Sequence, residues 1–120
     1  GKIESFSIIA ARLMFENIRE TSKNEFYYQK LFKEKCESLG YGKPTTRKSN
    51  LKDIPDAWVE RNGEKIPVEV KLREFNESAL DQLLRYISSY KAKRGIAVGE
   101  KLTVELPANI EFVSLDQLRA

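Results

Sequence analysis

The chain has 120 residues, 41% of them hydrophobic and 32% charged, and its net charge is +3. These values predict one soluble globular domain in the cytoplasm, without a membrane partner, because no apolar run approaches the roughly 20 residues of a membrane span. With no histidine and one cysteine, the chain also excludes serine–histidine or cysteine–histidine catalysis, an internal disulfide and a multi-cysteine zinc site.

Two helices are predicted at the start of the chain. An apolar stripe at helical spacing over residues 2–19 indicates an N-terminal helix. Ser22 and Glu25 then form a capping box, which marks the start of a second helix that would run to about Leu39 and stop at Gly40. The residues expected to pack this second helix onto the core are Tyr28, Leu31, Phe32, Cys36 and Leu39.

Residues 43–52 form a basic segment with four Lys or Arg residues and no acid. Such a segment is either a solvated loop or a phosphate-binding loop. We favour contact with nucleic acid because the segment directly precedes Asp56, and the residues predicted to make this contact are Arg47, Lys48, Ser49 and Lys52. A second cationic group follows the later helix, where it could also be an ordinary helix end: Lys91, Lys93 and Arg94.

A β-hairpin is predicted after the basic segment. Asn62-Gly63 is a strong signal for a two-residue hairpin turn, and Asp56 would open the first strand. Side chains alternate along a strand, so Glu69 and Lys71 of the second strand would share one face. The other face of that strand would carry Ile66, Val68, Val70 and Leu72.

The C-terminal half predicts one helix and further strands. The helix would begin near Asn76 or Ser78, with a core stripe formed by Leu80, Leu83, Leu84 and Ile87. Residues 95–99 and 110–114 predict strands, and a short turn would follow at 116–118. Alternation over residues 102–106 fits either an edge strand or a loop. The order of elements predicts an α/β fold, with a central mixed β-sheet flanked by helices.

Two acids and a lysine would therefore meet on one sheet face. Asp56 and Glu69 supply the oxygen ligands that a hard cation prefers, and Lys71 could position or help to activate a water molecule. This set is what metal-assisted hydrolysis of a phosphodiester needs. The alternatives are that Asp56 is only a turn residue and that Glu69 and Lys71 form a weak surface ion pair.

Pro55-Asp56 followed by Glu69-Val70-Lys71, with the hairpin signal between them, resembles the PD-(D/E)XK nuclease superfamily over residues 25–98. This superfamily includes restriction enzymes, RecB-type nucleases and archaeal Holliday-junction resolvases. The resemblance implies a single nuclease domain over residues 1–120, with a restriction-endonuclease-like core at 22–120 and an extra N-terminal helix at 1–21. It also implies bound Mg²⁺ or Mn²⁺, and the residues that would hold the metal are Glu25, Asp56, Glu69 and the backbone carbonyl of Val70.

Gln82 and Tyr86 are similar to the Gln-x-x-x-Tyr element of RecB-type nucleases. The resemblance implies that Gln82 lies beside the active site, with Asp56, Glu69 and Lys71, and that Tyr86 contacts nucleic acid. The alternative is two amphipathic residues on one helix face, away from the leucine stripe. Arg73 is a further phosphate contact expected from its position alone.

We therefore expect a metal-dependent endonuclease that acts on DNA, with branched or Holliday-junction DNA as one candidate substrate. The resolvase resemblance also implies a homodimer. Three alternatives stay open: an RNA-cleaving, toxin-type nuclease domain, a nucleic-acid-binding module of the same fold without catalysis, and a structural interaction domain.

Overall fold

The computed structural model describes residues 24–49 and 51–120. The predicted helix at 2–19 and the proposed cap at Ser22 lie outside these residues. The described part begins with a helix over residues 24–35, and the elements that follow are β1 (Lys43–Thr45), β2 (Ala57–Arg61), β3 (Glu64–Val70), β4 (Glu74–Phe75), α2 (Glu77–Ser89), β5 (Gly95–Gly99), β6 (Lys101–Leu102), β7 (Ile110–Ser114) and α3 (Leu115–Arg119).

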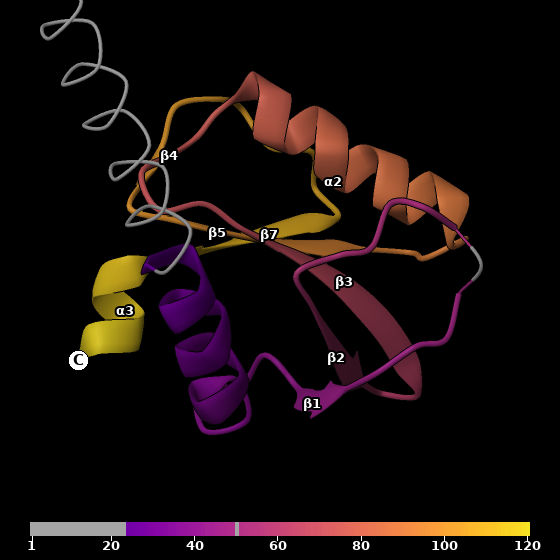
Figure 1. Cartoon of the computed structure of the whole chain (residues 1–120), viewed down its shortest axis with the longest axis horizontal. Helices are drawn as coiled ribbons and strands as arrows, with labels where there is room; N and C mark the ends of the chain where they lie inside the picture. Colours follow the sequence, from indigo (N-terminus) through magenta and orange to yellow (C-terminus); the bar gives the residue numbers. More distant parts are fainter. Residues whose placement is uncertain (1–23, 50) are drawn as a thin grey trace, which may run out of the picture.

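The predicted mixed sheet is confirmed. Its five strands lie in the order β1-β2-β3-β5-β7, and a separate two-stranded sheet joins β4 to β6. The β1–β2 and β2–β3 pairs are antiparallel, whereas β3–β5 and β5–β7 are parallel. Strand β3 therefore lies at the centre of the sheet, where the antiparallel hairpin meets the parallel half (Figure 1).

The turn between β2 and β3 has the predicted position and backbone conformation. Asn62 and Gly63 have φ angles of 54° and 79°, and positive φ at both central residues is what a type I′ turn requires. The register is then fixed, because Arg61 pairs with Glu64 and Ala57 pairs with Val68. A shift of one residue would turn every side chain of β3 to the other face of the sheet.

Pro67 lies inside β3, a position where proline usually breaks a sheet. It pairs with Trp58 of β2, but the register with β5 begins only at Val68, opposite Ile96. The missing N–H of Pro67 therefore costs no ladder hydrogen bond.

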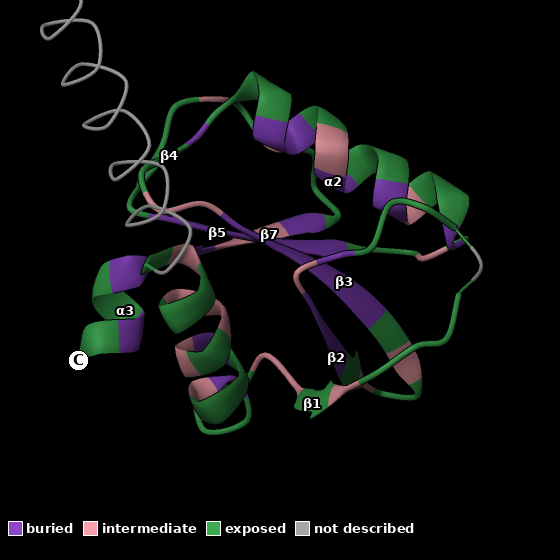
Figure 2. Cartoon of the chain, viewed as in Figure 1, coloured by how far each residue is buried: buried purple, intermediate pink, exposed green. Residues whose placement is uncertain are grey.

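Two apolar layers cover the two faces of the sheet (Figures 1 and 2). The helix over residues 24–35 and α3 pack on the face that carries Ile66, Val68 and Val70. Helix α2 packs on the other face, which is the face that carries Glu69 because side chains alternate along β3. The buried residues of the α2 layer are Trp58, Phe75, Ala79, Leu80, Leu83, Tyr86, Tyr90, Ala97 and Ile110.

The buried stripe of α2 differs from the predicted one. Leu80 and Leu83 are buried as expected, but Leu84 is 37% exposed, and Tyr86 and Tyr90 are buried instead. Tyr86 was therefore wrongly placed on a face away from the core. The tyrosines pack in the layer of Trp58, and this tertiary contact outweighs the leucine spacing.

The first described helix ends earlier than predicted. Its helical residues stop at 35, and a turn follows over residues 36–40. Tyr41 N–H donates to the Cys36 carbonyl oxygen at 2.9 Å, and Gly40 has a φ of 88°. Leu39 therefore lies in the turn and is 40% exposed, whereas it was predicted to pack against the core. In the part of the chain that the structure describes, no helix is long and apolar enough to cross a membrane.

Candidate active site

Asp56 lies immediately before β2, and two hydrogen bonds fix it there. Its N–H donates to the Val68 carbonyl oxygen at 3.0 Å, and its Oδ2 accepts the N–H of Val70 at 2.8 Å. The Asp56 side chain thus continues the β2–β3 ladder for one more step. These bonds direct the carboxylate at the C-terminal end of β3.

Glu69 is the one buried charged residue among those that the structure describes, and its side chain is 4% exposed. It lies in the middle of the sheet, opposite Ala97 of β5. Burial, a hydrogen bond with Asp56 and the negative charge of Asp56 together raise the pKa of Glu69 to about 9. The two carboxyl groups are therefore close enough to interact directly.

Lys71 follows on the same side of the strand as Glu69. Its backbone N–H donates to the Val98 carbonyl oxygen at 2.9 Å, which holds the end of β3 against β5. Its positive charge lowers the pKa of Glu69, although burial and Asp56 outweigh this effect. The structure thus brings Asp56, Glu69 and Lys71 together.

The Val70 carbonyl points to the same edge of β3 as the Asp56 side chain. In a strand, the N–H and C=O groups of one residue point to the same edge, and the Val70 N–H bonds to Asp56. Strand β2 begins at Ala57, opposite Val68, so no strand residue covers this edge of Val70. Its oxygen could therefore join the two carboxylates as a ligand.

Glu25 acts on the pair only through its charge. It raises the pKa of Glu69, but this is the weakest of the effects on that group. No group of three or more His, Cys, Asp or Glu side chains within residues 24–49 and 51–120 is placed to hold a metal ion. The prediction that Glu25 completes a three-carboxylate site therefore has no support in the geometry, and the oxygen atoms that could hold a cation here are those of Asp56, Glu69 and Val70.

Tyrosines of α2 hold the loop that leads into Asp56. The Tyr86 hydroxyl donates to the Ile54 carbonyl oxygen at 3.2 Å and accepts the Nε2–H of Gln82 at 2.7 Å. Four residues further on, at the C-cap of α2, the Tyr90 hydroxyl donates to the Asp53 carbonyl oxygen at 2.9 Å. The carbonyls of two successive loop residues are thus fixed from one helix.

This arrangement changes the interpretation of Gln82 and Tyr86. Tyr86 was expected to contact nucleic acid, but its ring is buried and its hydroxyl is engaged within the protein. Its pKa is raised to about 12, first by burial and then by the charges of Glu69, Asp56 and Asp53, against the opposing effect of its bond to Gln82. Tyr86 therefore lies near Asp56 and Glu69 but within the protein interior. Gln82 contacts Tyr86 and Arg85.

Removing one tyrosine hydroxyl should measurably weaken the fold. Tyr90→Phe keeps the buried ring but leaves the Asp53 carbonyl without its donor, so we expect a loss of about 1 kcal/mol in the free energy of unfolding. Urea denaturation would measure it. Tyr27→Phe is the matched control because Tyr27 is 58% exposed, and it should change stability by less than about 0.5 kcal/mol. Equal changes in the two variants would contradict the role of the Tyr90 hydroxyl.

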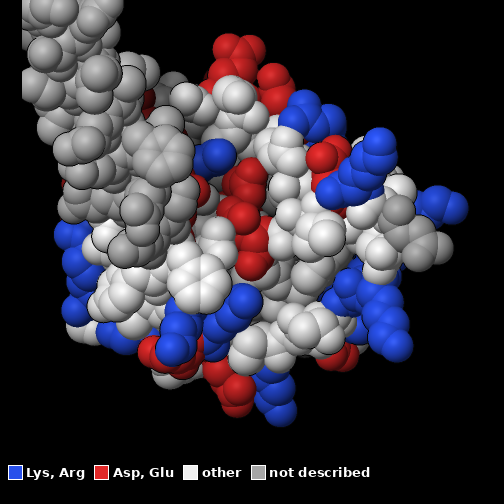
Figure 3. All heavy atoms as spheres, viewed as in Figure 1, with Lys and Arg blue, Asp and Glu red and all other residues white. Residues whose placement is uncertain are grey.

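The predicted phosphate contacts are exposed but spread over two regions. Arg47, Lys48, Ser49 and Lys52 lie between β1 and Asp56, and Ser49 Oγ accepts the N–H of Leu51 at 2.9 Å. Arg73 follows β3, and its carbonyl oxygen accepts the N–H groups of Glu100 and Lys101. In Figure 3 acidic side chains gather near the centre of the face shown, with Lys and Arg around its edges.

Sequence reasoning missed three contributors to this region. Asp53 and Ile54 take part through backbone carbonyls, which no residue pattern can indicate. Tyr90 has a signal in hindsight, because it follows Tyr86 by four residues and so lies on the same helix face.

Comparisons with known proteins give no match to this chain among family models, curated proteins or solved structures.

Proposed function

We propose that this chain is a metal-dependent phosphodiesterase that cleaves DNA and has a restriction-endonuclease-like core. The observation that carries the proposal is the contact of Asp56 with the buried Glu69 on one sheet face, with Lys71 two residues further on. The sheet order, with a β-hairpin joined to parallel strands and helices on both faces, is compatible with that core.

The donor set fits a hard divalent cation such as Mg²⁺ or Mn²⁺. Two carboxyl groups in contact repel each other once both are ionised, and this repulsion contributes to the raised pKa of Glu69. A cation between them would reverse the effect, because it favours the charged form of both. Asp56, Glu69 and the Val70 carbonyl offer only oxygen, which is the ligand type that these cations prefer.

Each residue then has a chemical role. A bound divalent cation would supply Lewis acidity and a more acidic water molecule. Asp56, fixed by the Val70 N–H, would hold that cation together with Glu69. The Lys71 ammonium would hold the attacking water and stabilise the negative charge that develops on the phosphate. The loop held by Tyr86 and Tyr90 would keep Asp56 in register with Glu69.

The proposal is tested with plasmid, linear duplex, four-way junction, single-stranded DNA and structured RNA in Mg²⁺, in Mn²⁺ and in EDTA. We expect cleavage of DNA that requires a divalent cation. Asp56→Asn should lower the rate by at least about 10²-fold, since it removes a carboxylate that would hold the divalent cation. Asp116→Asn is the control, because Asp116 is an exposed acid on α3.

The outcomes separate the alternatives. Cleavage that continued unchanged in Asp56→Asn, or in EDTA, would rule out the proposed mechanism. Cleavage of RNA alone would assign the chain to the RNA-cleaving class. Binding of DNA without cleavage in any metal would favour a non-catalytic binding module.

A further inference from the structure

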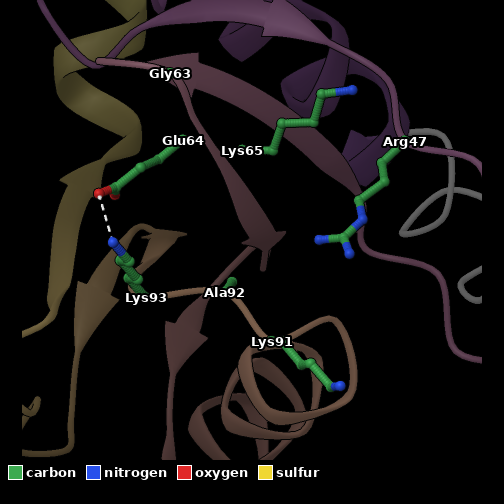
Figure 4. Close-up of a pocket in the computed structure, with 7 residues that line it drawn as sticks. All are labelled: Arg47, Gly63, Glu64, Lys65, Lys91, Ala92 and Lys93. Atoms are coloured by element: carbon green, nitrogen blue, oxygen red, sulfur yellow. Dashed lines mark ion pairs between the residues drawn. The ribbon is translucent and has the colours of Figure 1, made fainter.

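A basic cleft lies at the turn end of the β2–β3 hairpin, away from Asp56. Its volume is about 310 Å³, and it is lined by Arg47, Gly63, Glu64, Lys65, Lys91, Ala92 and Lys93. These residues come from three segments: the chain after β1, the hairpin turn and the residues after α2. Figure 4 shows the Arg47 guanidinium between these segments, with Lys65 and Lys91 on its two sides.

The charge of the cleft is not neutralised from within. Its one carboxylate, Glu64, is already paired with Arg94 at 3.2 Å and with Lys93 at 3.8 Å. Within the described part of the chain, no ion pair involves Arg47, Lys65 or Lys91. Three cations thus remain available to an anion.

Two of these cations are held in place by their surroundings. The Arg47 guanidinium lies 5.5 Å from the ring centroid of Trp58 and 5.1 Å from that of Tyr90. Stacking of this kind orients the planar group and leaves its N–H donors free at the edge. Lys65 Nζ donates to the Thr46 carbonyl oxygen at 2.9 Å, which holds its ammonium against the backbone of the residue before Arg47.

Lys91 occupies a backbone conformation that costs energy. It directly follows the C-cap of α2 at Tyr90, and its φ is 55°, in the left-handed region that favours glycine. Two hydrogen bonds that end the helix hold this conformation: the Lys91 N–H donates to the Ser88 carbonyl oxygen at 3.2 Å, and the Ala92 N–H donates to the Ile87 carbonyl oxygen at 2.9 Å. The backbone that carries the third cation of the cleft is therefore fixed.

The spacing between cleft and active site suggests the ligand. Glu64 and Glu69 are both on β3 and five residues apart, which is about 17 Å at about 3.4 Å per residue. One strand of duplex DNA carries a phosphate about every 3.4 Å along the axis. The cleft and the active site are therefore separated by the rise of about five base pairs, and the basic residues Lys48 and Lys52 lie in the loop between Arg47 and Asp56.

We propose that the basic cleft binds a backbone phosphate of duplex DNA about five base pairs from the bond that the active site cleaves. This inference rests on the proposed function for the identity of the ligand, and it adds a second anchor point for the substrate. Two separated anchors would fix the direction of the duplex over the site, which Asp56 and Glu69 alone cannot do.

The test measures binding of a labelled duplex in EDTA, so that no cleavage occurs, over a range of salt concentrations. The variant Lys65→Gln with Lys91→Gly removes two cations, and the glycine relieves the positive φ, so the fold should be at least as stable. We expect at least tenfold weaker binding at low salt. The slope of log affinity against log salt should become shallower by about 0.9, because the cleft binds one phosphate and each phosphate contact contributes about 0.9.

A neutral methylphosphonate in the DNA locates the contact. Placed about five positions from the mapped cleavage site, it should weaken binding to the wild-type protein but not to the double variant. Lys30→Gln with Lys33→Gln is the control for total charge, since both lysines are exposed on the helix over residues 24–35, which packs on the other face of the sheet.

The outcomes are distinct from those of the cleavage test. An unchanged salt slope in the cleft variant, or an equal change in Lys30→Gln with Lys33→Gln, would overturn the inference even if cleavage proceeds as proposed. Weaker binding of inorganic phosphate with unchanged duplex binding would also overturn it, because the cleft would then take a free anion. A shallower slope in a protein that cleaves nothing would support the cleft and reject the catalytic proposal.

Discussion

Glu69→Gln is expected to stabilise the metal-free protein at pH 8. The wild-type protein should lose stability as pH rises from about 4.5 to about 9, and the variant should lose much less. In the folded protein the pKa of Glu69 is about 9, against an ordinary value of 4.5, because the side chain is buried and contacts Asp56. Between these values the folded state holds a proton that the unfolded state releases.

The sign follows from this difference in bound protons. Stability falls as pH rises wherever the folded state binds more protons than the unfolded state. The contribution of Glu69 is thus fully present below pH 4.5 and is lost as pH rises toward 9, with a slope of at most about 1.4 kcal/mol per pH unit. Lys71 opposes the shift, whereas Glu25 and Asp56 add to it. Glutamine keeps the shape and hydrogen-bonding capacity of the side chain but does not titrate.

Urea denaturation of both proteins in EDTA from pH 5 to pH 9 would measure the effect. The difference in unfolding free energy between variant and wild type should grow with pH in favour of the variant. Mg²⁺ should then stabilise the wild type by mass action and leave the variant almost unchanged. Parallel pH profiles for the two proteins would show that Glu69 is ionised and solvated in the folded state.

The sequence was sufficient to predict the hairpin and the meeting of the three central residues. Asn62-Gly63 determines a two-residue turn, and the turn sets the register of β2 with β3. Once the register is set, the alternation of side chains places Glu69 and Lys71 on one face. Local signals of this kind need no knowledge of the rest of the fold.

The rotation of α2 could not be predicted in the same way. Leu80, Leu83 and Leu84 form one acceptable helical stripe, and the alternative stripe through Tyr86 and Tyr90 has equally good spacing. The choice depends on what the helix meets, and α2 meets Trp58 and the small residue Gly95. A Cβ at Gly95 would lie 2.9 Å from a methyl carbon of Ile87 and 3.1 Å from one of Leu83, so the helix sits very close to β5.

The surroundings of the acidic pair also depend on tertiary structure. The burial of Glu69 requires α2 and β5 to cover it, and the support of the Asp53–Ile54 backbone requires two hydroxyls that approach from a distant part of the chain. The basic cleft is assembled from segments around 47, 64 and 92. No periodic pattern relates such segments, so only the fold reveals that their charges meet.

Lys71→Met is expected to lower the rate of DNA cleavage by about 10²- to 10⁴-fold while leaving duplex binding almost unchanged. The substitution keeps the length and apolar stem of the side chain but removes the ammonium that the proposed mechanism places at the water and the phosphate. Most of the loss should therefore appear in kcat and little in KM.

A second effect of Lys71 can be separated from the first by pH and metal concentration. Because the positive charge of Lys71 lowers the pKa of Glu69, its removal should make Glu69 harder to ionise and weaken Mg²⁺ binding at neutral pH. The loss of activity that comes from weaker Mg²⁺ binding should disappear at higher pH and saturating Mg²⁺. The loss that comes from the missing ammonium at the water and the phosphate should persist. Lys71→Arg keeps the charge and should restore metal affinity more than it restores the rate, since a planar guanidinium cannot occupy the position of a compact ammonium. A Lys71→Met protein that cleaved within tenfold of the wild-type rate at saturating Mg²⁺ would show that Lys71 acts only by tuning Glu69.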